Sequence, residues 1–306
     1  NTKIIGTKIA QPRSYISSES GVARGNQNHF DPISQIIDRL AALNLMGHVV
    51  DKLEILVLGG TWSHHPKYYQ ESFVRDIHYA VNIYFDIMIG KEKREKLSLD
   101  EEMKINMTAD CRIIGLTLET RPDCITKREI KNMRRFNCTR IQLGIQHIDD
   151  DVLKKNNRNC YLKDTINALE ICMSNGMKVD THYMPDMPGS SFEKDQNMFN
   201  KILGVSSIEE IKKNYFKYNL LNSELQSDQW KIYPTEVTPF TQIKEWYDEG
   251  SFKPYGENEE VMKRLLLEMK EKVYPWVRLN RVVRDFEFKT TVVGGNLNPS
   301  LRDDLH

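Results

Sequence analysis

Strand-like apolar runs alternate with amphipathic helical segments along most of this chain, and this alternation constrains its fold more than any other feature. The segments expected as strands are 53–58, 112–119, 139–146, the first part of 177–189, 229–237 and 276–285, and those expected as helices are 32–46, 66–88, 126–136, 163–176, a segment from Phe192, 240–248 and 258–271. Strands joined through helices form right-handed crossovers in a parallel sheet. The sequence therefore predicts an α/β fold. A full or partial barrel is favoured, with a doubly wound open sheet as the alternative.

Two local signals support single elements of this pattern. Asp31 and Pro32 suit the cap and first position of the helix 32–46, and Gly47 suits its end. The charged stretch at 90–102 has no such pattern, and it is expected to be a solvated excursion.

The composition restricts the class of protein. A chain of 306 residues with 40% hydrophobic residues suits one large globular domain or two smaller ones. Lys and Arg number 43, as do Asp and Glu, so binding to nucleic acid must be local. No apolar run approaches the roughly 18 residues of a membrane span, and no signal peptide is visible. We expect a cytoplasmic protein without a membrane partner.

The cysteines do not form a recognisable metal site. There are five, and no two are closer than 12 positions: Cys111, Cys124, Cys138, Cys160 and Cys172. This spacing contains no Cys-x-x-Cys pair and no zinc-ligand pattern. The sequence predicts reduced, mostly buried thiols.

Residues at which predicted strands stop are the candidates for ligand binding, because ligands of parallel α/β folds bind at the carboxyl ends of strands. The first strand stops at Gly59, Gly60 and Thr61. Glycine lets a ligand approach the backbone closely, although a tight turn is the alternative. The second strand stops at Glu119, which suits ribose hydroxyls or an amino group, or else an ion pair with Arg121.

The third and fourth strands end in further polar residues. Gln146 offers a donor and an acceptor for a ribose or carboxylate, or it starts a helix. Arg158 suits a carboxylate, or it belongs to a solvated basic helix end. His182 precedes the rigid loop 184–189, and a lone histidine is more often a core residue than a ligand. One ligand with an ammonium, a carboxylate, a ribose and a base explains all of these residues together, and S-adenosylmethionine (SAM) is such a ligand.

These stretches resemble the radical-SAM domain of the catalytic subunit (subunit three) of the Elongator complex. The matching blocks are "LVLGGTW", "GLTLETRPD", "CTRIQLGIQ", "KKNNRN", "THYMPDMPG", "WKIYPT" and "VRLNRVVRDF", and the resemblance as a whole extends from about Ser14 to Asn296. The resemblance implies a partial (β/α)6-type barrel over 1–290, with 291–306 as the start of a linker to an acetyltransferase domain. The segment 204–227 is extra relative to the family.

The resemblance also implies roles for single residues. For SAM it implies Gly59, Gly60 and Thr61 at the ammonium, Glu119 and Gln146 at the ribose region, Arg158 at the carboxylate and His182 by the nucleoside. Lys52 would bind acetyl-CoA, and Lys231 and Tyr233 would face the substrate. The pattern asks nothing of His64 and His65, which are expected to be local loop and helix-start residues.

The family also binds a 4Fe-4S cluster through three closely spaced cysteines, and none of the five cysteines has that spacing. We expect the cysteine loop to lie upstream of residue 1.

The implied activity is modification of the wobble uridine (U34) of tRNA. SAM and acetyl-CoA would be used to attach a carboxymethyl-type group at C5 of that base. Arg278, Arg281 and Arg284 would contact tRNA phosphates, as would the basic segment 126–136 unless it is an ordinary solvated helix face. Other Elongator-type subunits or a second copy of the chain are further expected partners. A tRNA- and acetyl-CoA-binding barrel without radical chemistry is the first alternative. Another radical-SAM branch, related to porphyrin-synthesis oxidases, is the second.

Overall fold

The computed structural model describes residues 20–204, 223–239, 241–283, 292–298 and 301–305, three isolated positions between 207 and 212, and the backbone of two short strands near the N-terminus. These strands, β1 (Thr2–Lys3) and β2 (Ala10–Gln11), pair in a two-stranded sheet. Arg284 and most of the predicted insertion at 204–227 lie outside the described residues.

The main sheet has six strands, whose order in the sheet equals their order in the chain. They are β3 (Lys52–Val57), β4 (Arg112–Thr120), β5 (Arg140–Gln146), β6 (Lys178–Tyr183), β7 (Gln229–Ile232) and β8 (Arg278–Val282). The pairs β3–β4, β6–β7 and β7–β8 are parallel. A doubly wound sheet would reverse its strand order at a switch point, whereas sequential order is the topology of a (β/α) barrel. The predicted partial (β/α)6-type fold is therefore confirmed.

The chain forms two compact units, one of residues 1–10, 120–130 and 141–306 and the other of residues 11–119 and 131–140. The predicted domain division at residue 290 stays a prediction.

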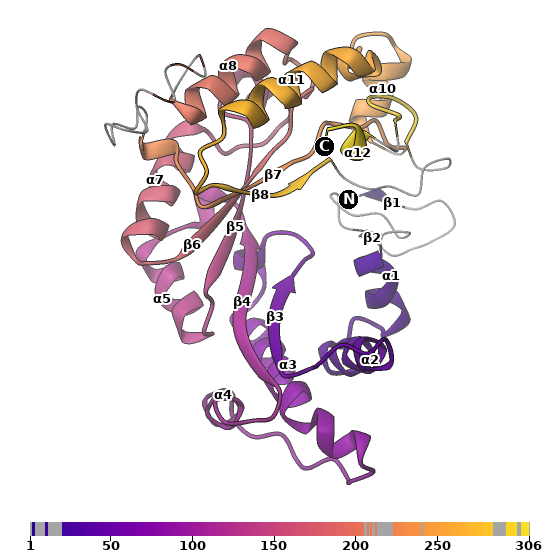
Figure 1. Cartoon of the computed structure of the whole chain (residues 1–306), viewed down its shortest axis with the longest axis vertical. Helices are drawn as coiled ribbons and strands as arrows, with labels where there is room; N and C mark the ends of the chain where they lie inside the picture. Colours follow the sequence, from indigo (N-terminus) through magenta and orange to yellow (C-terminus); the bar gives the residue numbers. More distant parts are fainter. Residues whose placement is uncertain are drawn as a thin grey trace. The chain divides into compact units, whose positions relative to one another are not determined.

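The second unit contains β3, most of β4 and the helices α1 (Ser20–Gln27), α2 (Pro32–Leu45), α3 (Lys67–Met88) and α4 (Leu99–Asn106). The predicted cap of α2 is confirmed, because Asp31 Oδ2 accepts a hydrogen bond of 2.7 Å from Ser34 N. Helix α2 packs on α3, and α3 on α4 (Figure 1). Their shared core joins Leu40 of α2 to Val81 and Tyr84 of α3, so these helices bury their apolar stripes against one another and against the start of the sheet.

The expectation of a solvated excursion at 90–102 is wrong for its second half. Ser98 and Glu101 form a capping box that begins α4. Glu102 is fully buried, and its carboxylate receives Arg94 Nη2 at 2.6 Å and Leu97 N at 3.0 Å. A charged sequence can enter a core when each charge meets a partner, and this pairing is not visible from the composition of the stretch.

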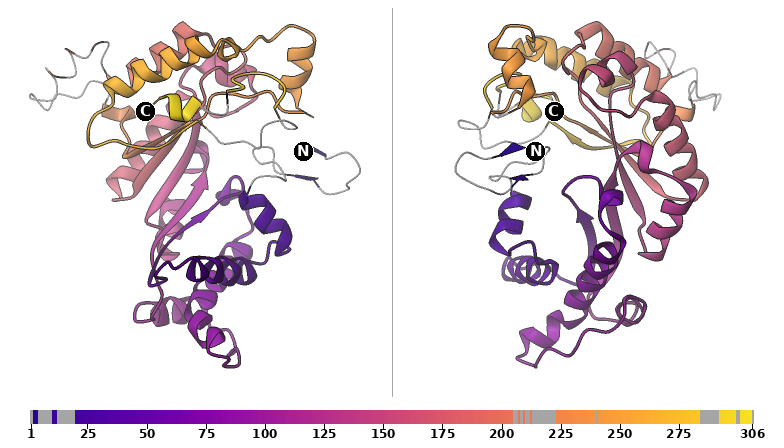
Figure 2. Two further views of the ribbon diagram at one scale, coloured as in Figure 1. Left: turned by 45° about the vertical axis from the view of Figure 1, so that its right-hand side comes forward. Right: turned by 180° about the vertical axis from the view of Figure 1, so that it is seen from behind.

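The first unit contains β6, β7, β8 and nearly all of β5, with helices after the strands (Figure 2). These helices are α6 (Asp150–Lys155), α7 (Leu162–Ser174), α8 (Phe192–Leu203), α10 (Gln242–Asp248), α11 (Glu259–Lys272) and α12 (Leu301–Asp304), while α5 (Lys127–Arg135) connects β4 to β5. Short 3-10 helices cover Pro122–Cys124, Ser223–Leu225 and Tyr255–Glu257 in this unit and Trp62–His64 in the second unit. Helix α7 packs on β6, and α8 packs on α11.

One face of this part of the sheet is an aromatic and aliphatic core. The rings of Tyr183 on β6 and Trp230 on β7 meet edge to face with centroids 5.6 Å apart, and Phe199 of α8 lies 6.2 Å from Tyr183. All three side chains are buried. Because side chains alternate along a strand, the neighbours of these residues face the opposite side of the sheet. Across the described part of the chain, no helix has the length and apolarity needed to cross a membrane.

Candidate active site on the polar face of β5–β8

The second face of β5–β8 is polar. On β5, Ile141, Leu143 and Ile145 are buried on the helix side, so Gln142 and Gln146 belong to the opposite face. The same alternation places three further polar residues there: Asp180 and His182 of β6, and Lys231 of β7. His182 and Lys231 are register partners in the parallel pair β6–β7. Two residues predicted to contact different ligands, His182 and Lys231, therefore lie side by side.

Asp180 is the centre of this face. Its side chain is 0% exposed, and its Oδ2 accepts hydrogen bonds of 2.9 Å from Gln142 Nε2 and from Asn280 Nδ2 of β8. Lys231 Nζ lies 3.9 Å from the same oxygen. A buried carboxylate is costly unless donors and an opposite charge surround it, and this one has both. Sequence reasoning missed Gln142, Asp180 and Asn280, because none of them ends a strand, and the blocks that contain Gln142 and Asn280 implied no role for either residue.

Tyr233 follows β7 directly and lies near His182. The two ring centroids are 6.2 Å apart, and both side chains are half-buried. The backbone N of Tyr233 donates to Tyr183 O at 2.9 Å, which continues the ladder between β6 and β7. The structure thus brings together three of the residues predicted from sequence, His182, Lys231 and Tyr233.

Arg158 lies over β5. Its Nη2 donates to Gly144 O, and a Cβ atom placed on Gly144 would lie 2.9 Å from that same nitrogen. Helix α6 ends at Lys155, so Arg158 is not part of a solvated helix end. A glycine at 144 is explained physically, because only a residue without a side chain leaves room for the guanidinium.

Backbone strain accompanies the polar face. Gln146, the last residue of β5, has φ 72°, and Asp186, in the loop after β6, has φ 67°. Residues other than glycine rarely adopt positive φ, and such strain is concentrated at functional sites. Met184 N holds the strained end of β5 by donating to Gln146 O at 2.7 Å. The strain supports a functional reading of Gln146 rather than that of an ordinary helix-start residue.

A buried network fixes the loop after β6. Asp195 accepts hydrogen bonds from Ser190 Oγ at 2.6 Å, from Asp186 N at 2.6 Å and from the hydroxyl of Tyr255. His147 Nδ1 accepts from Asp149 N at 2.9 Å, so its Nε2 carries the proton that is shared with Asp195 at 2.9 Å.

Asp186 belongs to the same network. Its carboxylate accepts from Tyr255 N and Gly256 N at 3.0 and 2.8 Å. Burial nevertheless raises the pKa of Asp186 to about 8. The residues of this network have no local sequence signature, so the network could not be predicted from the sequence.

The second unit contains the other predicted SAM residues. Gly59 and Gly60 have φ of 129° and 113°, and a Cβ on either would meet no atom within 4 Å. These glycines are therefore required by backbone conformation rather than by crowding, and the space beside them is open. Thr61 precedes the 3-10 helix Trp62–His64, and Glu119 is half-buried near the end of β4. Their assignment to SAM stays a prediction.

Other predictions from sequence have mixed outcomes. Lys52 is exposed at the amino end of β3, in register with Arg112, and its role toward acetyl-CoA stays a prediction. The guanidinium of Arg121, considered as a partner for Glu119, forms a two-pronged ion pair with Asp123 at 2.7 and 2.9 Å.

The histidine pair behaves as expected. The carbonyl of His65 accepts from Gln70 Nε2 at 3.1 Å, and the His65 ring lies 5.1 Å from that of Tyr69. This confirms the expectation that His64 and His65 are local loop and helix-start residues.

The cysteines do not fit an iron–sulfur cluster. Four are buried and Cys124 is half-buried, as predicted from sequence. Burial raises the pKa of the Cys111 and Cys160 thiols to about 11 and that of Cys138 to about 12, whereas a cluster ligand must be a thiolate. Within the described ranges, no three His, Cys, Asp or Glu residues are grouped so that they could hold a metal ion. The five cysteines, all of which the structure describes, therefore form no group of the kind that holds a cluster.

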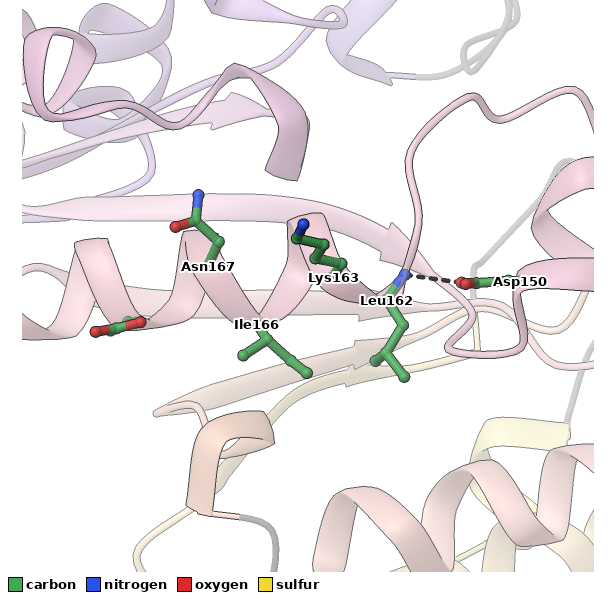
Figure 3. A pocket seen from close by; sticks show the side chains of 6 residues that line it. Asp150, Leu162, Lys163, Ile166 and Asn167 are labelled. Carbon is green, nitrogen blue, oxygen red and sulfur yellow. Dashed lines mark hydrogen bonds between the residues drawn. The ribbon is translucent and has the colours of Figure 1, made fainter.

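A surface hollow lies elsewhere, lined by Asp150 of α6 and by five residues of α7 (Figure 3). Leu162 N donates to Asp150 Oδ1 at 2.8 Å across it. The hollow contains none of the strand-end residues, so it carries no functional assignment.

Comparison with known proteins agrees with this arrangement. Residues 38–202 match the sequence family described as the radical SAM superfamily, and residues 227–304 match the radical SAM C-terminal domain. The tRNA uridine(34) acetyltransferase of Methanocaldococcus infernus is 35% identical over 284 residues, which are 93% of this chain and 48% of that protein. Elongator complex protein 3 of Homo sapiens is 30% identical over 288 residues, 93% of this chain and 47% of that protein.

A solved structure is also similar. The archaeal Methanocaldococcus infernus Elp3 with an N-terminal deletion superposes with a TM-score of 0.77 at 34% identity, over 92% of this chain and 60% of that one. The chain spans about half the length of the curated relatives it matches.

Proposed function

The chain belongs to the radical SAM superfamily, and from this premise we propose that it is the SAM-binding part of an enzyme that modifies the wobble uridine of tRNA. Its relatives carry the names tRNA uridine(34) acetyltransferase and Elongator complex protein 3. The proposed reaction attaches a carboxymethyl-type group at C5 of that uridine, with acetyl-CoA as the source of the two carbons.

The single observation that carries the SAM assignment is the position of Arg158. Its guanidinium is anchored on the carbonyl of Gly144, near the carboxyl end of β5, where parallel α/β folds bind ligands. A guanidinium held in this way suits the SAM carboxylate, because it can donate two parallel hydrogen bonds. Gln146 at the end of β5 is proposed for the ribose and His182 on β6 for the nucleoside. SAM, when bound, is the source of the radical that this superfamily uses to activate its substrates.

Two further contacts complete the proposal. Lys52 is proposed to bind the phosphates of acetyl-CoA, since it is an exposed ammonium that can act as a point charge. Arg278 and Arg281, exposed on β8, are proposed to contact tRNA phosphates. Arg284 lies outside the described residues. Other Elongator-type subunits, or a second copy of this chain, are proposed as partners.

SAM binding by calorimetry tests the central assignment. Replacing Arg158 with Ala should weaken SAM about 10- to 100-fold, since hydrogen bonds to charged groups contribute about 1.5–3 kcal/mol. Arg264→Ala is the matched control, because Arg264 forms an exposed ion pair with Glu268 on α11. Equal SAM affinity in the Arg158→Ala and unmodified proteins would remove Arg158 from the site.

A second experiment separates the proposal from a barrel without radical chemistry. The protein expressed from its complete gene is reconstituted with iron and sulfide under anaerobic conditions, then given SAM and tRNA. Release of 5′-deoxyadenosine is the expected result. SAM binding without this release would favour the tRNA- and acetyl-CoA-binding barrel. Release without tRNA binding would favour another radical-SAM branch.

A further inference from the structure

We propose that Asp180 is a positioning residue for Lys231: it holds the lysine ammonium charged and in place on the polar face of β5–β8, beside His182. This inference rests on the proposed function, together with the expectation from the sequence that Lys231 faces the substrate. Asp180 touches neither ligand in this proposal and acts only through the lysine.

The geometry behind the proposal is the convergence on one atom. Asp180 Oδ2 is reached by Gln142 from β5, by Asn280 from β8 and by Lys231 from β7, at 2.9, 2.9 and 3.9 Å. A single carboxylate oxygen of β6 thus links all four strands. The two amides also restrict the carboxylate, so that the position of its negative charge is set independently of the lysine.

A structural role alone explains this cluster poorly. Replacing a buried ion pair with apolar groups is often neutral or stabilising, so the pair is weak evidence for stability. Gln142 Oε1 is a buried acceptor that has no hydrogen-bond partner among the described residues, although the amide of the same side chain binds Asp180. A buried acceptor left unpaired is destabilising, and a donor from a bound ligand would remove that cost.

The charged and titratable groups around Lys231 define the consequence. Asp180 and His182 face it from β6, Arg281 of β8 is its register partner, and Tyr233 follows two residues later. Asp180 supplies the negative charge of this set. Without the carboxylate, a side chain that is only 6% exposed would lose its proton at lower pH.

The test compares Asp180→Asn with the unmodified protein. The asparagine keeps the size of the side chain and an oxygen for the amides of Gln142 and Asn280, and it removes the charge. We expect SAM affinity to stay within about twofold, tRNA modification to fall about tenfold or more, and the alkaline limb of its pH profile to move to lower pH by about one unit or more. Asp228→Asn is the matched control, because Asp228 pairs with the exposed Lys178 at the other end of the same strands, 3.3 Å away.

The titration of Lys231 itself is a readout independent of activity. It is monitored by NMR through the chemical shift of the labelled Cε atom, and the signal of Lys231 is identified by its absence in Lys231→Arg. A lower pKa of Lys231 in Asp180→Asn supports the proposal even if the modified tRNA product is a different one. An unchanged titration, with activity falling only in step with thermal stability, would overturn it.

The double variant Asp180→Asn with Lys231→Met separates a loss of activity from a loss of folding. It should recover the stability that the lone charge costs, and it should stay inactive on tRNA. Recovery of activity in this double variant would show that the pair is structural only. Failure of the unmodified protein to bind SAM would instead refute the proposed function and leave the lysine titration to decide the role of Asp180.

Discussion

Arg158 and Gly144 are complementary: Nη2 of the arginine donates to the glycine carbonyl, and a Cβ atom on residue 144 would lie only 2.9 Å from that nitrogen, which is too close. We therefore predict that Gly144→Ala displaces the guanidinium at small cost to stability, because the end of a flexible side chain can move. SAM affinity, measured by calorimetry, should fall about tenfold as the charge-assisted contact is lost.

Gly115→Ala on β4 is the matched control for this prediction. A Cβ there would meet Glu54 Cγ and Thr139 Oγ1 at 3.4 Å, which is a much milder contact. SAM affinity that survives Gly144→Ala would mean that the position of Arg158 over β5 does not matter for binding.

Gly60 is required by its backbone conformation. With φ of 113°, an alanine there is strained even though the space is open. Gly60→Ala should lower the free energy of unfolding by about 1–3 kcal/mol, measured with urea. Gly21→Ala, within helix α1, should instead be neutral or stabilising by about 0.5–1 kcal/mol. Equal stability of Gly60→Ala and the unmodified protein would contradict the conformational argument.

Asp186 makes stability depend on pH. Burial raises its folded-state pKa to about 8, above the unfolded value of roughly 4. A group with a raised folded pKa contributes stability that is complete below the unfolded pKa and is lost as pH rises through the folded one. The free energy of unfolding should therefore decline between about pH 4 and about pH 8, in part because of Asp186.

Unfolding by urea at several pH values measures this dependence. Asp186→Asn cannot ionise, so its curve should be flatter over the same pH range. Parallel curves for the two proteins would assign the pH dependence to other groups.

Glu102 and Arg94 stabilise the unit that contains α4. Burial favours the neutral form of Glu102, but hydrogen bonds from Arg94, Leu97 and Asn82 outweigh this and hold its pKa below the usual range. Arg94→Met leaves the buried carboxylate without its main partner, and we expect a loss of about 3 kcal/mol in a urea titration.

Lys91→Met is the comparison variant, since Lys91 and Asp86 form an exposed pair that should contribute at most about 1 kcal/mol. A similar small loss in both variants would show that the Glu102 pair is effectively solvated.

Local patterns in the sequence determined the elements of this protein and their class. Periodicities of two and 3.6 residues, and caps such as Asp31, depend on neighbouring residues only, so they predicted the alternation of strands and helices and the ends of most of them. Strand ends in a parallel fold are where ligands bind, and this rule selected Gln146, Arg158 and His182 from the order of residues alone. Helix α4 was not predicted from the sequence, because the ion pair that stabilises it, between Arg94 and Glu102, is formed by charged residues.

Only the tertiary structure decided how the polar face is built. Gln142 and Asn280 are 38 and 100 positions from Asp180 in the chain, and no local pattern relates them. Parallel strands of a sequentially ordered sheet bring such residues into register, where one carboxylate oxygen can accept from several strands at once. A lone aspartate in a strand has no signature by itself, because its meaning depends on partners that only the assembled sheet supplies.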